Sequence, residues 1–237
     1  MRLLVTRPLP DAHDTARRLI AAGHEALVQP LLRIVFAPPP REVAEPAGLL
    51  ITSRNALRAV QSWPQARRWR DRPLFAVGKT TAREAAAAGF SDVRIGGGDA
   101  TALADAVREA LSPDAGPLIY PAARERTGEL AETLTDEGYT VTVVETYRAE
   151  SVVDLDPAVR QALVEEALDG VLLYSRRTAE AFLAAVARAG LTQRLSGVTA
   201  YALSADIGGA LAGVVAEVKW PERPEEALLL VLIGAET

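Results

Sequence analysis

Cysteine is absent from this 237-residue chain, and histidine is nearly so, with only two residues. The missing cysteine excludes disulfides, thiolate catalysis and cysteine-based zinc sites. His13 and His24 fall on opposite sides of one helical pattern, a spacing that does not suit metal binding. Neither histidine follows an expected strand, so no base is placed there to activate a serine nucleophile. The sequence therefore predicts neither a metal centre nor a serine hydrolase.

Long apolar runs are also missing. No stretch approaches the roughly 20 apolar residues of a membrane-spanning helix. The first apolar run ends at Val5, which is too short for the core of a secretory signal. With no cysteine present, we expect a cytoplasmic protein. A hydrophobic content of 49% and a charged content of 24% are typical of a folded chain, long enough for one large or two small domains.

Two glycine-containing segments resemble nucleotide-binding loops but lack their spacing. Leu74–Ala82 reads LFAVGKTTA, yet a phosphate loop needs a glycine where Pro73 stands. Gly96, Gly97 and Gly98 lack the spaced pattern of a dinucleotide fingerprint. The net charge of −5 argues against a nucleic-acid partner, which calls for a basic face. We therefore expect no nucleotide cofactor and no nucleic acid.

Short apolar runs alternate with helical spacings along the whole chain. This alternation is typical of α/β proteins with doubly wound parallel sheets, which bind ligands beyond the carboxyl ends of their strands. Helical spacing joins Ala16, Leu19 and Ile20, then Leu103, Val107 and Leu111, then Leu130 and Leu134, and then Phe182 and Val186. The expected strands are 3–6, 26–29, 49–52, 74–77, 93–95, 118–120, 141–144, 171–174 and 199–203.

The chain also repeats itself. Residues 48–60 (GLLITSRNALRAV) align with residues 170–182 (GVLLYSRRTAEAF), and in both a strand ends in Ser-Arg before a helix. A fainter pair joins 19–32 to 134–147, and a third pair joins 76–82 to 202–208. The first strand and helix have their counterpart at 118–144. We therefore expect two similar domains: a discontinuous domain of residues 1–33 plus 149–237, and an inserted domain of residues 34–148. The extended stretches 31–36 and 146–151 would form a two-stranded hinge.

Hydroxyl and basic residues recur where the expected strands end. Small hydroxyl residues cap the partly positive amino ends of helices, and arginines beside them make receptors for carboxylates or phosphates. Each residue alone is equally explained as a helix cap or a solvated surface charge. Their recurrence at one edge of successive parallel strands predicts that they surround one cleft between the two domains. The candidates are Thr6, Arg7, Thr52, Ser53, Arg54, Gly78, Lys79, Thr80, Thr81, Arg124, Arg126, Ser175 and Arg176.

Tyr147 stands apart from these candidates. It lies in Val144–Arg148 (VETYR), at the exit of a strand and on the expected crossing between the domains. From there its side chain could reach into the cleft as a proton donor. The alternative is a structural tyrosine with a buried ring and a solvated hydroxyl.

Five segments together resemble the uroporphyrinogen-III synthase family of tetrapyrrole and heme biosynthesis, over essentially the whole chain. They are residues 50–57 (LITSRNAL), 76–82 (AVGKTTA), 118–124 (LIYPAAR), 144–148 (VETYR) and 172–175 (LLYS). The family's second Gly-Pro-Thr-Thr turn appears here as residues 203–208 (LSADIG), which adds Ser204 to the candidates and brings in the acidic Asp206.

The resemblance implies a lyase that closes hydroxymethylbilane, a linear tetrapyrrole with eight carboxylates, into uroporphyrinogen III. The last ring would be inverted through a spiro intermediate, with Tyr147 as the acid. It implies a monomer without metal, nucleotide or redox cofactor, and hydroxymethylbilane synthase as an upstream partner. Two alternatives stay open because the second turn differs. The chain could instead be a non-catalytic two-domain binding protein for a small anion, or a regulatory module.

Overall fold

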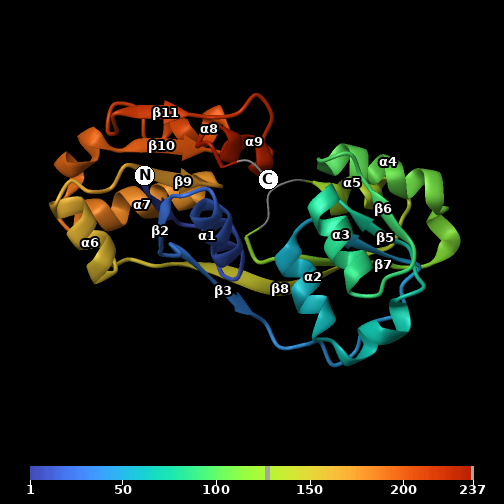
Figure 1. Cartoon of the computed structure of the whole chain (residues 1–237). Helices are drawn as coiled ribbons and strands as arrows, with labels where there is room; N and C mark the ends of the chain where they lie inside the picture. Colours follow the sequence, from blue (N-terminus) through green and yellow to red (C-terminus); the bar gives the residue numbers. More distant parts are fainter. Residues whose placement is uncertain (126–128, 236–237) are drawn as a thin grey trace. The chain divides into compact units, whose positions relative to one another are not determined.

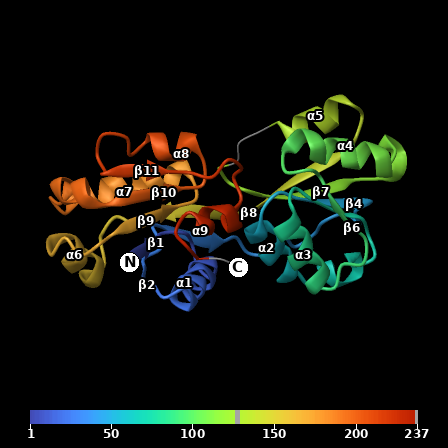
Figure 2. The same ribbon diagram turned by 45° about the horizontal axis from the view of Figure 1, so that its top comes forward.

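The structure is a computed structural model that describes residues 1–125 and 129–235. The chain divides into two compact units (Figure 1), the first made of Met1–Arg33 and Glu150–Thr237 and the second of Ile34–Ala149. In each unit helices cover both faces of a sheet, as the two views in Figures 1 and 2 show. The predicted α/β fold with doubly wound parallel sheets is confirmed. Within the described residues, no helix is long and apolar enough to cross a membrane.

The first unit is built on a five-stranded sheet in the order β11-β10-β9-β1-β2, in which all pairs are parallel. Each strand is short, and a helix follows most of them. The strands are β1 (Arg2–Val5), β2 (Glu25–Val28), β9 (Gly170–Leu173), β10 (Thr199–Ala202) and β11 (Glu217–Lys219). The helices are α1 (Asp11–Ala21), α6 (Pro157–Val164), α7 (Arg176–Arg188), α8 (Ala205–Gly209) and α9 (Glu226–Val231), with a 3-10 turn at Thr192–Gly197.

Successive side chains of the central strands point to opposite faces of this sheet, so the core of the unit is divided between the two faces. On β1, Leu4 packs with α6 and α7, while Leu3 and Val5 pack with α1 and α9. On β9, Leu172 faces the α1 side and its neighbours face the α7 side. These side chains are fully buried. Strands buried on both faces read as continuous apolar runs, which explains why residues 3–5 and 171–173 contain no polar side chain.

The second unit contains a six-stranded sheet in the order β3-β8-β7-β4-β5-β6. Leu49 and Ile51 of its central strand β4 pack beneath α2 and α3, and Leu50 packs beneath α4 and α5. The strands are β3 (Leu32–Phe36), β4 (Gly48–Ile51), β5 (Leu74–Ala76), β6 (Val93–Ile95), β7 (Leu118–Ala123) and β8 (Val141–Ser151). The helices are α2 (Arg54–Gln61), α3 (Lys79–Ala87), α4 (Ala100–Ala110) and α5 (Leu130–Asp136), with 3-10 turns at Pro64–Trp69 and Pro113–Ala115.

The two sheets share one spatial order with a shifted starting point. The order β8-β7-β4-β5-β6 in the second unit matches the order β2-β1-β9-β10-β11 in the first. In this alignment the segment β7-α5-β8 corresponds to β1-α1-β2, and the segment β4-α2 corresponds to β9-α7. In each sheet the chain reverses its winding once, between β7 and β4 in the second unit and between β1 and β9 in the first. Such a switch point opens a crevice at the carboxyl ends of the strands, where open α/β sheets bind ligands.

Two strands connect the units along the chain, β3 on the way out and β8 on the way back. The backbone N–H of Val152 donates to the carbonyl of Leu31, and that of Ala37 donates to the carbonyl of Thr146. The residue numbers rise along β3 while those of its partners fall along β8, so the two strands are antiparallel. The extended stretch predicted at 31–36 corresponds to β3 apart from Leu31, and the stretch predicted at 146–151 lies in β8.

The first unit shows details that the sequence pattern did not give. Ile20 shares the helical spacing of Ala16 and Leu19 but is 59% exposed, because α1 directs Ala16 and Leu19 toward the sheet. Strand β11 was not predicted, since its residues Glu-Val-Lys form a short edge strand without an apolar run. Helix α9 was also not predicted, although Leu229 and Leu230 are fully buried beside β1.

Gly170 and Gly48 begin the equivalent strands β9 and β4, and both are closely packed. A Cβ on Gly170 would lie 2.8 Å from the Tyr201 ring, and a Cβ on Gly48 would lie 3.0 Å from the Phe75 ring. Gly170→Ala is therefore expected to lower the free energy of unfolding by about 1 to 3 kcal/mol, because the well-packed core must shift. Urea denaturation measures the change. Gly197→Ala, where a Cβ meets nothing within 4 Å, is the control, and equal losses in both variants would contradict the packing explanation.

Candidate functional site

Ser53 and Thr52 leave the carboxyl end of β4 at the switch point of the second unit. Ser53 has extended backbone angles and caps α2, because its Oγ accepts a hydrogen bond from the backbone N–H of Ala56 at 3.0 Å. Ser175 caps α7 in the same way, accepting from the N–H of Thr178 at 3.1 Å. The Ser-Arg repeat in the sequence therefore corresponds to two matching strand-to-helix corners.

Tyr147 on β8 reaches the capping serine from the other side of the switch point. Its hydroxyl lies 2.9 Å from Ser53 Oγ, and the ring of Phe36 packs edge-on against its ring at 6.4 Å between centroids. A second hydroxyl pair lies alongside, with Thr52 Oγ1 3.3 Å from the hydroxyl of Tyr120 on β7. The structure thus brings together three predicted residues and adds Tyr120. We define these four side chains as the hydroxyl cluster: Thr52, Ser53, Tyr120 and Tyr147.

Tyr120 was missed because it lies inside a buried strand and looks like a core residue. It is 5% exposed, and its ring packs with the α4 and α5 side of the core. The sequence did offer one signal. Tyr120 ends the expected strand 118–120, and the corresponding strand of the other domain, 3–6, ends in the candidate Thr6.

Burial governs the acidity of Tyr147. Desolvation raises the pKa of its hydroxyl above the usual value, the hydrogen bond with Ser53 opposes that rise, and Tyr120 and Glu125 add to it. The phenol therefore keeps its proton throughout the neutral pH range. A half-buried hydroxyl that stays protonated is suited to donate a hydrogen bond to an oxygen placed beside it.

The amino end of α3 lies next to this cluster, because β5 pairs with β4. Gly78 caps α3 with extended backbone, and a Cβ added there would meet nothing within 4 Å. Lys79 and Thr80 are exposed on the first turn, whereas Thr81 is buried. The first N–H groups of a helix have no partner inside it, so this end attracts anions.

The arginines predicted around the second unit's site are engaged with acidic neighbours. Arg54 Nη1 lies 3.4 Å from Glu84, and Arg124 forms an exposed ion pair with Glu145 at 2.8 Å. The exposed Arg124 pair can exchange partners at little cost, whereas the side chains of Arg54 and Glu84 are only 20% and 33% exposed. Arg126, also predicted, lies outside the described residues.

In the first unit, Arg7 and Thr6 leave β1 as predicted but are occupied inside the protein. Thr6 is fully buried and its hydroxyl donates to the carbonyl of Leu172, which ties β1 to β9. Arg7 Nη1 donates to Glu226 Oε1 at 2.7 Å, and its guanidinium carbon lies 4.0 Å from the centroid of the Tyr174 ring. The hydroxyl of Thr15 donates to the same carboxylate oxygen at 2.8 Å.

This network, which we call the Glu226 network (Arg7, Thr15, Tyr174 and Glu226), fixes the charges of its members. Burial alone would raise the pKa of Glu226, but the positive charge of Arg7 and the hydrogen bonds from Thr15 and Arg7 hold it below its ordinary value. Burial and the negative charge of Glu226 raise the pKa of Tyr174 to about 12. Arg7 therefore already binds a carboxylate, supplied by α9.

The remaining candidates of the first unit surround the turn after β10. Arg176 pairs with Asp206 at 3.0 Å and with Glu180 at 3.3 Å, and all three side chains are exposed. Ser204 begins α8 without a side-chain cap hydrogen bond. The acidic residue in the altered turn thus partly neutralises one of the predicted substrate-binding arginines.

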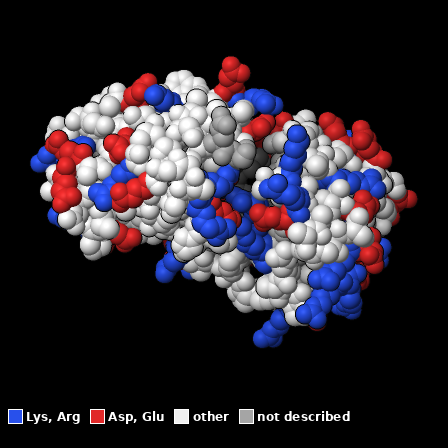
Figure 3. Space-filling view, in the orientation of Figure 1, with Lys and Arg blue, Asp and Glu red and all other residues white. Residues whose placement is uncertain are grey.

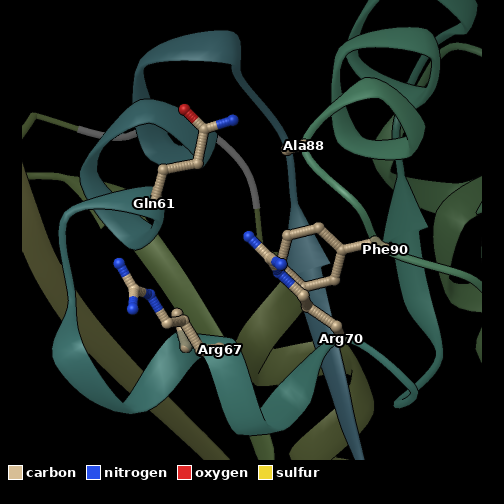
Figure 4. Close-up of a pocket in the computed structure, with 6 residues that line it drawn as sticks. Gln61, Arg67, Arg70, Ala88 and Phe90 are labelled. Atoms are coloured by element: carbon tan, nitrogen blue, oxygen red, sulfur yellow. The ribbon is translucent and has the colours of Figure 1, made fainter.

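A separate hollow of about 290 Å³ lies in the second unit, lined by Gln61, Ala66, Arg67, Arg70, Ala88 and Phe90 (Figure 4). These residues lie at or after the carboxyl ends of α2 and α3. The hollow is therefore at the edge of the sheet where the parallel strands begin, opposite the edge that carries the hydroxyl cluster. Figure 3 shows Lys and Arg gathered at the lower right of the view, over the segment that contains the exposed Arg67, Arg68, Arg70 and Arg72. No predicted site residue lines this hollow.

Among residues 1–125 and 129–235, no group of three or more His, Cys, Asp or Glu side chains is placed to hold a metal ion.

Fold and site together define a class: α/β proteins of two similar doubly wound units, with hydroxyl groups and helix amino ends at the carboxyl edge of each sheet. Within that class, a family model described as uroporphyrinogen-III synthase HemD matches residues 13–229. The chain belongs to the uroporphyrinogen-III synthase family, enzymes of heme biosynthesis that act on a small-molecule substrate.

Solved structures agree on the fold. A uroporphyrinogen-III synthetase from Helicobacter pylori superimposes with a TM-score of 0.64 at 18% identity, covering 98% of each chain. A mutant uroporphyrinogen III synthase from Thermus thermophilus gives a TM-score of 0.56 at 20% identity, covering 99% of this chain and 98% of that one. A comparison with curated proteins gave no match.

The Glu226 network predicts a specific loss of stability. Glu226→Gln removes the nearer of the two carboxylates that face the mostly buried Arg7 and leaves Asp11 at 3.7 Å, so the free energy of unfolding at pH 7 should fall by about 1.5 to 3 kcal/mol. Because the pKa of Glu226 is lowered on folding, its contribution is complete above the ordinary value of 4.5 and is lost as the pH falls through the folded value. Wild type should therefore lose more stability than the variant between pH 7 and strongly acidic pH.

Urea denaturation at several pH values measures both effects. Glu180→Gln, which removes an exposed partner of Arg176, is the control and should change stability little. Equal effects of the two substitutions, or a parallel pH dependence in wild type and Glu226→Gln, would contradict the assigned network.

Proposed function

We propose that this chain is a lyase that closes hydroxymethylbilane into uroporphyrinogen III, with the hydroxyl cluster of the second unit as the site of chemistry. The observation that carries the proposal is the contact of Tyr147 with Ser53, at a switch point beside the open amino end of α3. Family membership supplies the reaction class. In this proposal the chain acts as a monomer and takes its substrate from hydroxymethylbilane synthase.

Substrate binding in this proposal depends mainly on the second unit. The substrate carries eight carboxylates on flexible acetate and propionate arms. Lys79, Thr80 and the amino end of α3 offer an exposed cationic surface, and Arg124 can exchange its exposed acidic partner for a substrate carboxylate. Each charged hydrogen bond contributes about 1.5 to 3 kcal/mol. Arg7 contributes less because Glu226 holds it in a largely buried ion pair, whereas the exposed Arg176 can exchange Asp206 in the same way as Arg124 exchanges Glu145.

The chemical step begins with loss of the terminal hydroxyl as water, which leaves an azafulvenium cation. Tyr147 stays protonated at neutral pH and donates to the departing oxygen, while Ser53 holds the phenol in place. The substituted carbon of the last ring then attacks to form the spiro intermediate, which fragments and recloses with that ring inverted. The pyrrole carbon bonded in the closure loses its proton, which leaves the neutral product and restores the proton of the phenol. Holding the flexible chain in the conformation for spiro attack is an orientation effect.

Tyr147→Phe tests this assignment. Loss of the donor should lower kcat about 10- to 100-fold with KM nearly unchanged, because the hydrogen bond matters most as the hydroxyl departs. Steady-state kinetics with freshly prepared hydroxymethylbilane, read as uroporphyrinogen III formed, measures the effect. Tyr201→Phe, whose hydroxyl has only a weak 4.0 Å contact with the Met1 sulfur, is the matched control. If Tyr147→Phe turns over as fast as Tyr201→Phe, the tyrosine has no part in the reaction.

Lys79→Gln tests the binding role of the α3 amino end. Removing this exposed charge should raise KM about threefold and leave kcat nearly unchanged, since uniform binding is lost. The difference should shrink at high salt. Lys219→Gln is the control, because Lys219 pairs with Glu217 on β11 of the other unit. Equal KM values for the two variants would exclude Lys79 from substrate binding.

A further inference from the structure

An extra residue interrupts β8 immediately before Tyr147. The parallel register with β7 runs in step from Leu118 opposite Val141 to Ala122 opposite Glu145, and then places Ala123 opposite Tyr147. Thr146 has no partner in this register and forms a β-bulge. Bulges are rare between parallel strands and commonly redirect a side chain beside a functional site.

The bulge decides which face of the sheet Tyr147 occupies. Successive residues of β7 point to opposite faces, and Ala122 packs with the α4 and α5 side of the core. Glu145, opposite Ala122, therefore lies on that side, and Tyr147, opposite Ala123, lies on the α2 side. The contact of the Tyr147 hydroxyl with Ser53, the cap of α2, agrees with this placement.

A regular strand would turn Tyr147 away from Ser53. Without the extra residue, Thr146 would lie opposite Ala123 and Tyr147 would share the face of Glu145. The phenol would then face away from the amino end of α2.

Thr146 is held firmly in the bulge. Its side chain is buried, and its hydroxyl donates to the carbonyl of Ala122 at 3.0 Å. Its own carbonyl accepts from the N–H of Ala37 at 2.9 Å, and the carbonyl of Tyr147 accepts from the N–H of Arg124 at 2.8 Å. The hydroxyl bond is the one side-chain contribution among these three.

We propose that Thr146 is a positioning residue: its buried hydroxyl bonds the carbonyl of Ala122 and stabilises the bulge that directs Tyr147 toward Ser53. The inference rests on the proposed function, because it gives Thr146 its effect through Tyr147. It adds a buried residue that lies outside the hydroxyl cluster.

Thr146→Val keeps the shape of the side chain and removes the donor. It should lower kcat about tenfold with KM little changed, because the phenol is misaligned for the chemical step. Thr146→Ser, which keeps the hydroxyl, should restore most of the activity. Thr142→Val is the matched control on the same strand, where the threonine is exposed. Full activity in Thr146→Val, or equal loss in Thr146→Ser, would overturn the inference.

A double-mutant cycle separates positioning from general stability. In the Tyr147→Phe background, Thr146→Val should cause no further loss of kcat, because the group through which it acts is gone. Multiplied losses in the double variant would show that Thr146 acts independently of Tyr147, and would overturn the inference.

A readout without substrate keeps the two proposals distinguishable. With tyrosine labelled at 13Cζ, the resonance that disappears in Tyr147→Phe reports the ionisation of Tyr147. Its pKa should change from the wild-type value in Thr146→Val, because both the burial of the phenol and its hydrogen bond with Ser53 change, and should stay at the wild-type value in Thr142→Val. An unchanged pKa in Thr146→Val would overturn the positioning role. If the pKa changes but Tyr147→Phe retains full activity, the positioning role stands and the proposed catalytic role fails.

Discussion

The parallel direction of the strands is the constraint on which the rest of the structure depends. In each unit it brings the amino ends of the helices that follow strands to one edge of the sheet, together with the residues that cap them. The reversal of winding then opens a crevice between the two central strands. The Ser53 to Tyr147 contact lies at this crevice, so a serine that would otherwise only cap a helix also holds a phenol.

The two units use this shared arrangement differently. In the first, acidic side chains of the same chain occupy the basic ones: Glu226 binds Arg7, and Asp206 binds Arg176. In the second, the amino end of α3 remains exposed beside the hydroxyl cluster. Both units pair arginines with acidic side chains of their own, as Arg54 with Glu84 and Arg124 with Glu145 in the second, so the difference between them lies in the exposed amino end of α3 with Lys79. That end retains a surface that suits a polyanion.

Local patterns in the sequence predicted most of the strands, because a strand buried on both faces must read as an apolar run. The Ser-Arg repeat predicted two matching corners, and the structure has both. The edge strand β11 carried no comparable signal, whereas the apolar run 227–233 (ALLLVLI), which includes most of helix α9, was present in the sequence but was not assigned to an element. The partners of the arginines were also beyond prediction, since Arg7 and Glu226 meet only through the fold. The bulge at Thr146 was hidden for the same reason: register belongs to a pair of strands and cannot be read from one.

The most direct test of the central claim is the isomer composition of the product. Hydroxymethylbilane closes without an enzyme to the type I isomer, so only directed spiro attack gives type III. Incubation of freshly prepared hydroxymethylbilane with the purified chain, followed by oxidation and chromatographic separation of the isomers, should yield predominantly type III. Type I alone, at the rate of the uncatalysed reaction, would contradict the assignment of this activity to the chain.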